Sequence, residues 1–109
     1  VRMVQLASVR ERAPSARMFW DQAHDRWTFV AHHLPATGAG RTYQLWLITP
    51  ADRKISAGTF TPRADGAALV RATYALARDS LAAVAVTEEP SGGVEQPTGD
   101  IVVAGRAER

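Results

Sequence analysis

The stretch Tyr43-Gln44-Leu45-Trp46-Leu47-Ile48 carries bulky side chains at successive positions. Successive side chains of a β-strand point to opposite faces, so both faces of this segment would be largely apolar. That pattern suits a central strand covered on two sides, or an edge strand whose tryptophan lies beneath a loop. We expect this segment to form the hydrophobic centre of the domain.

A second segment, Trp27-Thr28-Phe29-Val30-Ala31-His32, alternates instead, with the large rings on one face and Thr28 and His32 on the other. Short apolar segments recur about every ten to fourteen residues and are separated by proline, glycine and aspartate, which is typical of β-sandwiches and barrels. We therefore predict an all-β fold, an antiparallel two-sheet β-sandwich of about eight short strands. The predicted strands are residues 3–9, 17–20, 26–33, 42–49, 56–61, 68–74, 82–88 and 101–104.

Residues 67–83 leave a helix open as an alternative, because they are rich in alanine, leucine and arginine. Leu69, Ala72 and Leu76 could line one helical face. However, Asp79-Ser80 interrupts this pattern, and the β alternation resumes at residues 84–86. The sequence favours a strand followed by a short helical turn near residues 78–81.

The amino-acid composition limits the classes of protein to which this chain could belong. A length of 109 residues, with 46% apolar and 22% charged residues, indicates one globular domain. The absence of cysteine excludes disulfides, thiolate catalysis and cysteine-ligated zinc. No apolar run approaches the about 18 residues of a membrane helix. The net charge is only +2 and the basic residues are scattered, so we expect no nucleic-acid partner.

The three histidines are the first candidates for a metal site or a general base. His32 and His33 are adjacent and would point to opposite faces of a strand, while His24 lies in a predicted turn. A metal site needs about three converging ligands, so we expect no metal and no cofactor. The alternative, a metal-dependent hydrolase, requires His24, His32 and an acidic residue to converge.

Adjacent carboxylates at Glu88 and Glu89 suggest acid–base chemistry, but neighbours on a strand diverge, whereas a glycosidase pair must face each other. We expect one of them to bind the backbone amides of the Ser91-Gly92-Gly93 turn and to hold that loop closed. Motifs for nucleotide binding and for a serine nucleophile are absent, so an enzyme is not expected. The tryptophans Trp20, Trp27 and Trp46 lie inside apolar segments, which favours the core over an exposed binding strip.

Two phrases occur in a distinctive order. The first comprises Leu34-Pro35, residues 41–48 and Gly58-Thr59-Phe60, and the second comprises residues 85–93 and 96–102. Together they resemble the extracytoplasmic C-terminal domain of RskA-type anti-sigma factors, the anti-sigma-K family, over nearly the whole chain. The positions that carry the resemblance, interpreted as structural and not catalytic, are Tyr43, Gln44, Leu45, Trp46, Gly58, Phe60, Glu89, Pro90, Gly92, Gly93, Pro97, Thr98 and Gly99.

The resemblance implies a regulatory role. Such proteins have a cytoplasmic zinc-associated domain that holds a sigma factor of the ECF type, one membrane helix, and an outer β domain that acts as the sensor. Proteolysis outside the membrane and then within it, by a site-1 and an intramembrane protease, frees the sigma factor. This chain has neither the His-x-x-x-Cys-x-x-Cys motif nor the helix, so the resemblance identifies it as an excised single outer domain. Its link to a sigma factor would run only through the missing cytoplasmic domain.

Three expectations follow for function. Folding of the domain would gate cleavage upstream of Val1, since proteases cut exposed flexible segments. Open sheet edges would allow two copies to pair. The alternative to a sensor domain is a secreted ligand-binding or adhesive β-sandwich, which requires at least one solvent-facing indole.

Overall fold

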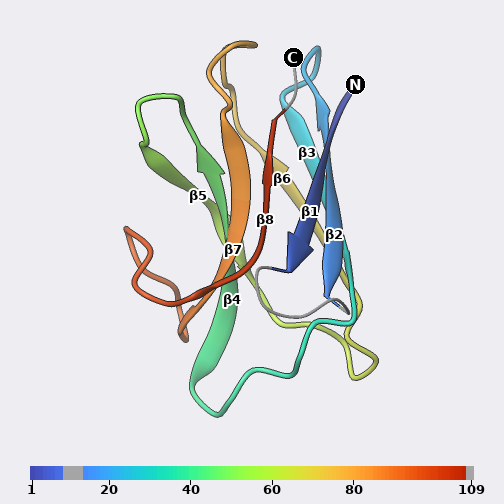
Figure 1. Cartoon of the computed structure of the whole chain (residues 1–109), viewed down its shortest axis with the longest axis vertical. Helices are drawn as coiled ribbons and strands as arrows, with labels where there is room; N and C mark the ends of the chain where they lie inside the picture. Colours follow the sequence, from blue (N-terminus) through green and yellow to red (C-terminus); the bar gives the residue numbers. More distant parts are fainter. Residues whose placement is uncertain (9–13, 108–109) are drawn as a thin grey trace.

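The computed structural model describes residues 1–8 and 14–107. Within them the chain forms eight β-strands, paired antiparallel throughout, and no helix (Figure 1). This confirms the all-β prediction, and each predicted strand overlaps an observed one. Val9, predicted to end the first strand, lies outside the described residues. The strands are β1 (Arg2–Ser8), β2 (Ser15–Asp21), β3 (Arg26–His32), β4 (Arg41–Ile48), β5 (Lys54–Phe60), β6 (Ala68–Thr73), β7 (Ala83–Pro90) and β8 (Ile101–Arg106).

The prediction of two packed sheets was wrong. The described strands form a single sheet in the order β5-β4-β7-β8-β1-β2-β3-β6, which curls into a nearly closed, barrel-like shape (Figure 1). The reason is β8, which pairs with β7 on one side and with β1 on the other. Among the described residues, β8 pairs with β1 through Ala7 with Ala104 and Ser8 with Val103. This pairing links two four-stranded halves that would otherwise be separate sheets.

The edge strand β5 approaches β3, the neighbour of the other edge strand β6, through aromatic side chains. Phe60 of β5 lies with its ring centroid 5.5 Å from that of Phe29 on β3 and 5.7 Å from that of Tyr43 on β4. In the described residues β5 and β6 are not paired with one another. The barrel-like sheet is thus closed on that side by side-chain packing instead of backbone hydrogen bonds.

The core fills the inside of this curled sheet. Trp20 and Trp27 lie directly opposite each other on β2 and β3, with ring centroids 4.4 Å apart and planes 10° from parallel. The guanidinium of Arg2 lies 5.4 Å from the Trp20 ring centroid, a cation–π arrangement. All three tryptophans are at most 1% exposed, as predicted; Trp20 and Trp27 belong to this core, whereas Trp46 is buried on the outer face of the sheet. Other fully buried core residues are Met18, Phe29, Ala31, Leu47, Val84, Val86 and Val103.

Residues 67–83 contain no helix. The segment forms β6 and then runs without regular structure up to β7, with one turn in which the Ser80 amide donates to the Ala77 carbonyl at 2.9 Å. The helical turn predicted near residues 78–81 is therefore a single hydrogen-bonded turn. Leu81 is buried in the core, and Leu76 is partly buried and packs against the core. These apolar residues therefore contribute to the core between the strands and not to a helix.

Strand β4 is covered on both sides, as its bulky pattern indicated. Tyr43, Leu45 and Leu47 belong to the core inside the sheet. The alternate residues point outward, yet Gln44 and Trp46 are only 3% and 0% exposed. They lie beneath the β7–β8 loop, residues 91–100, which folds back beside β4 and β5 (Figure 1).

Candidate functional site

The outer face of β4 and β7 carries polar side chains that are buried even though they point away from the core. On each strand they occupy alternate positions, which places them on one face of the sheet. The β7–β8 loop shields them from solvent. The buried residues of this face are Thr42, Gln44, Trp46, Ala85, Thr87 and Glu89.

Gln44 fastens the first half of the loop to β4. Its side-chain oxygen accepts a hydrogen bond from the Val94 amide at 2.9 Å, and its side-chain nitrogen donates to the Val94 carbonyl at 2.9 Å. The same nitrogen donates to the Ser56 hydroxyl of β5 at 2.7 Å. A side-chain amide thus pairs with one loop residue as a neighbouring strand would, because it offers both a donor and an acceptor.

Trp46 begins a chain of buried hydrogen bonds that ends at Glu89. The indole N–H of Trp46 donates to the Thr87 hydroxyl at 2.8 Å, and that hydroxyl donates to the Glu89 carboxylate at 2.6 Å. A hydroxyl can accept one hydrogen bond while donating another, so Thr87 connects Trp46 of β4 to Glu89 of β7. Every side-chain polar atom along this series of hydrogen bonds, from Trp46 to Glu89, has a partner, as a low-dielectric site requires.

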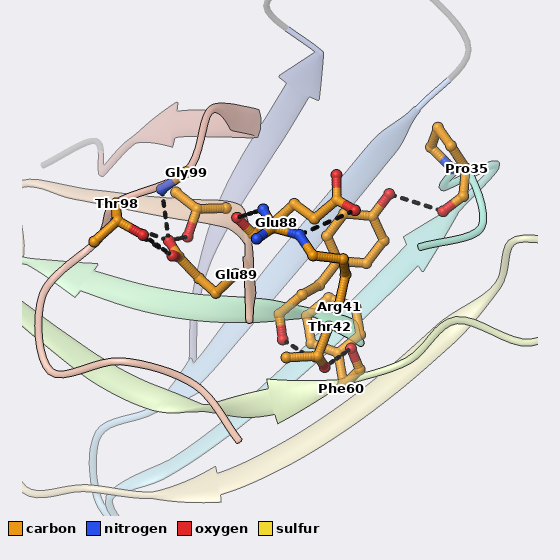
Figure 2. Close-up of polar contacts among 10 residues, drawn as sticks. Pro35, Arg41, Thr42, Phe60, Glu88, Glu89, Thr98 and Gly99 are labelled. Atoms are coloured by element: carbon orange, nitrogen blue, oxygen red, sulfur yellow. Dashed lines mark hydrogen bonds and ion pairs between the residues drawn. The ribbon is translucent and has the colours of Figure 1, made fainter. Parts of the chain in front are cut away.

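Glu89 fastens the second half of the loop and is 0% exposed. Its carboxylate accepts hydrogen bonds from the Thr98 hydroxyl at 2.6 Å, the Thr98 amide at 3.1 Å and the Gly99 amide at 3.1 Å (Figure 2). The prediction that a glutamate of the pair holds the loop closed is correct in role. It was wrong about the partners, because the amides belong to Thr98 and Gly99 and not to residues 91–93.

The environment of Glu89 favours its charged form. Burial alone raises the pKa of a carboxyl group, but the hydrogen bonds from Thr87, Thr98 and Gly99 outweigh burial and hold the pKa of Glu89 below its ordinary value. A buried carboxylate with several donors is a strong, directional anchor.

Glycines allow the loop to follow this path. Gly92 and Gly93 have φ of 91° and 80°, the left-handed region that side chains disfavour, and the Gly93 amide donates to the Pro90 carbonyl at 2.9 Å. Gly99 needs no unusual φ, but a Cβ there would overlap the carbonyl oxygen of Glu88. Pro97 lies in the loop immediately before Thr98, ahead of the amides that bind Glu89.

The start of β4, where Thr42 lies opposite Glu89, is fixed by a second group of contacts (Figure 2). The Tyr43 hydroxyl donates to the Pro35 carbonyl at 2.7 Å, and the Thr42 hydroxyl donates to the Phe60 carbonyl at 2.9 Å. Burial, and then the charge of Glu88, raise the pKa of Tyr43, so this phenol remains a donor. Gly58, with φ of 119°, pairs with Leu45 at the bulge where β5 changes register against β4.

The histidines do not form a common site. His24 lies in the β2–β3 turn, and its Nδ1 is 2.9 Å from an oxygen of Asp21, whose pKa is lowered by this hydrogen bond. His32 ends β3 at the opposite end of that strand, and His33 follows with φ of 61°, so the strand stops between the adjacent pair. Among the residues that the structure describes, no three histidine, aspartate or glutamate side chains gather as metal ligands.

The positions singled out in the sequence include three residues of this face, Gln44, Trp46 and Glu89. They do not include Thr42, Ala85 and Thr87 of the same face, or its contacts Ser56 and Val94. Thr87 could have been found, because it lies two residues before Glu89 and therefore shares its face on a strand. Ser56 and Val94 carry no comparable signal, since their roles depend on how β5 and the loop fold against Gln44. The burial of all three indoles also removes the solvent-facing tryptophan that the adhesive alternative requires.

A family model described as anti-sigma-K factor RskA, C-terminal, matches residues 1–101. The chain belongs to this family. No curated protein matches, and no solved structure matches either. The match covers the whole outer face of β4 and β7 and the loop above it.

RskA family membership identifies a regulatory domain of an anti-sigma factor. It implies a sigma factor as partner and a membrane-associated parent protein. No helix in residues 1–8 and 14–107 is long and apolar enough to cross a membrane. What the site itself does is mechanical: buried groups of β4 and β7 fasten residues 91–100 across the sheet.

Proposed function

We propose that this RskA-type domain lies on the extracytoplasmic side of the membrane, anchored by a helix outside this chain, and controls proteolytic release of a sigma factor. A domain outside this chain holds the sigma factor. The fastened β7–β8 loop keeps the outer domain folded, and the folded domain protects the upstream segment from cleavage.

The observation that carries this proposal is how the buried polar groups are used. Both carboxylate oxygens of Glu89 and both polar atoms of the Gln44 side chain bind the loop or an adjacent strand. None of these groups is presented to solvent as a catalytic or ligand-binding group would be. Side chains arranged in this way favour a domain whose folded state is the functional signal.

The position of β1 supports the link to cleavage. β1 is an interior strand of the sheet, paired with β2 along its length and with β8 at its far end. It begins at Arg2, whose side chain donates to the Arg78 carbonyl at 2.7 Å. Proteases need an extended, flexible substrate, so a first strand held in this way limits their access to the segment before Val1.

The test uses the full-length protein in its own membrane. Gly99→Val, which places a branched side chain against the Glu88 carbonyl, loosens the loop and should speed the appearance of the cleaved fragment and the activity of a sigma-dependent reporter. The matched control is Gly38→Ala, where a Cβ meets only the Arg41 side chain at 3.8 Å. If Gly99→Val unfolds the domain and cleavage does not accelerate, gating by folding is wrong.

Location is tested separately by labelling. Arg63 is exposed in the β5–β6 connection, so Arg63→Cys gives a reactive thiol in a domain that has no other cysteine. A membrane-impermeant maleimide should label this thiol in intact cells. Labelling that requires cell lysis would contradict the extracytoplasmic location.

A further inference from the structure

The outer face of β1, β2, β3 and β6 differs from that of β4 and β7, because no described segment is fastened across it. Its apolar side chains point outward, with Met3 48% and Leu69 61% exposed. Phe19 lies opposite Met3, and Val30 lies opposite Leu69, so the four form two neighbouring rows across the strands. We call this surface the open face, and its residues are Met3, Arg17, Phe19, Thr28, Val30, Leu69 and Arg71.

Two cations stand among these apolar residues. Arg17 is opposite Val30 on the neighbouring strand, and Arg71 is opposite Thr28. Both arginines are exposed, and neither makes an ion pair or hydrogen bond within the described part of the chain. The four strands contain one carboxylate, Asp21, which is engaged with His24. The open face is therefore both apolar and positively charged.

Shallow hollows accompany the two arginines. One, of about 240 Å³, is lined by Arg17 together with Gln5, Phe19 and His32. The other, of about 620 Å³, is lined by Arg71 together with Arg26 and Thr28, and also by Asp21, whose carboxylate is engaged with His24. Each hollow places a guanidinium beside space that a phosphate group could enter, and guanidinium and phosphate match in charge and hydrogen-bond geometry.

These features disfavour two kinds of occupant. A second copy of the chain, docked face to face by a twofold axis, would place Arg17 and Arg71 of one copy near the same residues of the other, and like charges would repel. An extended peptide lying across the face would cross the strands and leave its own backbone amides without protein partners; extended peptides that bind sheets add to an edge instead. Lipid headgroups carry no such requirement, because their phosphates accept hydrogen bonds wherever a guanidinium lies.

We propose that the open face docks on an anionic phospholipid surface. Arg17 and Arg71 bind headgroup phosphates, while Met3, Phe19 and Leu69 enter the interfacial layer. This rests on the proposed function in one respect, since a domain tethered outside a membrane would meet such a surface. The position of β1 suits docking of this face on the membrane. β1 contributes Met3 to the open face and directly follows Val1, where the proposed membrane anchor would join.

The experiment measures binding of this chain to vesicles by flotation. We expect binding to vesicles of phosphatidylcholine mixed with phosphatidylglycerol, weakening as salt is raised, and little binding to phosphatidylcholine alone. The double variant Arg17→Gln, Arg71→Gln should bind about twenty-five-fold more weakly, because each arginine near an anionic surface contributes roughly a factor of five. Leu69→Ser should also weaken binding and tests the apolar part independently.

The matched control is Arg53→Gln, Arg63→Gln, which removes the same charge from exposed turns outside the open face. It should change binding by no more than about threefold, since screening limits the reach of distant charges to about 10 Å. Equal losses in both double variants, binding that ignores phosphatidylglycerol, or self-association in place of vesicle binding would each overturn the proposal. All of these outcomes leave the cleavage test with Gly99→Val unaffected, so the two hypotheses fail separately.

Discussion

The amide of Gly99 donates a hydrogen bond to the buried carboxylate of Glu89 at 3.1 Å, and the missing side chain of Gly99 is what permits it. The backbone of Gly99 passes against the carbonyl of Glu88, the residue before Glu89 on β7, and a Cβ at Gly99 would overlap that oxygen. Glycine is needed here for space, not for a left-handed φ. The loop and the strand are therefore joined at a point where neither can shift without breaking a buried bond.

Gly99→Ala should destabilise the domain by about 2 kcal/mol or more, because backbone that is held by hydrogen bonds cannot move aside for the added methyl group. Urea unfolding followed by circular dichroism measures the free energy of unfolding. Gly38→Ala, where the new Cβ would make an ordinary contact at 3.8 Å, is the control and should change it by less than about 0.5 kcal/mol. Equal effects from the two substitutions would show that the close approach is not important.

Glu89→Gln should destabilise by about 2 kcal/mol, since hydrogen bonds to a charged acceptor are stronger than neutral ones and the new NH2 group would face donors. The neighbouring residue provides the control. Glu88 is 3.9 Å from the Arg41 guanidinium with both side chains partly exposed, so Glu88→Gln should cost no more than about 0.5 kcal/mol. If the two substitutions cost the same in urea unfolding, the buried carboxylate is not the anchor.

The positions of the strands could be predicted because their signals are local. Alternation of large rings at Trp27 and Phe29, and turn residues between apolar segments, depend on a few neighbouring positions. The doubly bulky stretch 43–48 likewise indicated a strand covered on both sides, which β4 is. Over residues 67–83 the local composition suits a helix as well as a strand, and this is why a helix stayed open as an alternative there.

The arrangement of the strands could not be predicted, because it depends on contacts between distant residues. The pairing of β1 with β8, seen in the described residues between Ala7 and Ala104 and between Ser8 and Val103, decides between two sheets and one. Gly105 helps at this junction by letting the backbone of Gln5 pass close to it, a requirement invisible in the sequence. For Glu89 the nearest turn was the natural guess, whereas the chain returns after nine residues to present Thr98.

Stability should fall in acid partly through Glu89. Its pKa is below the ordinary glutamate value of 4.5 in the folded protein, so the unfolded chain takes up the proton first. The stabilisation is therefore complete above that value and is lost as pH falls through the lower, folded pKa. Urea unfolding from neutral to acidic pH should show a shallower decline for Glu89→Gln than for the native chain. Parallel curves would mean that Glu89 titrates alike in both states.

The stacked pair Trp20 and Trp27 should be visible spectroscopically. Two indoles with centroids 4.4 Å apart couple their electronic transitions, so the native chain should show an exciton couplet in the circular dichroism of the indole bands. Trp20→Phe should abolish the couplet, whereas Trp46→Phe should preserve it, because Trp46 is not stacked on either partner and binds Thr87 instead. Both variants should keep indole fluorescence poorly quenched by acrylamide, since the remaining rings are buried. Strong quenching in the native chain would contradict that burial and would revive a ligand-binding role for an exposed tryptophan.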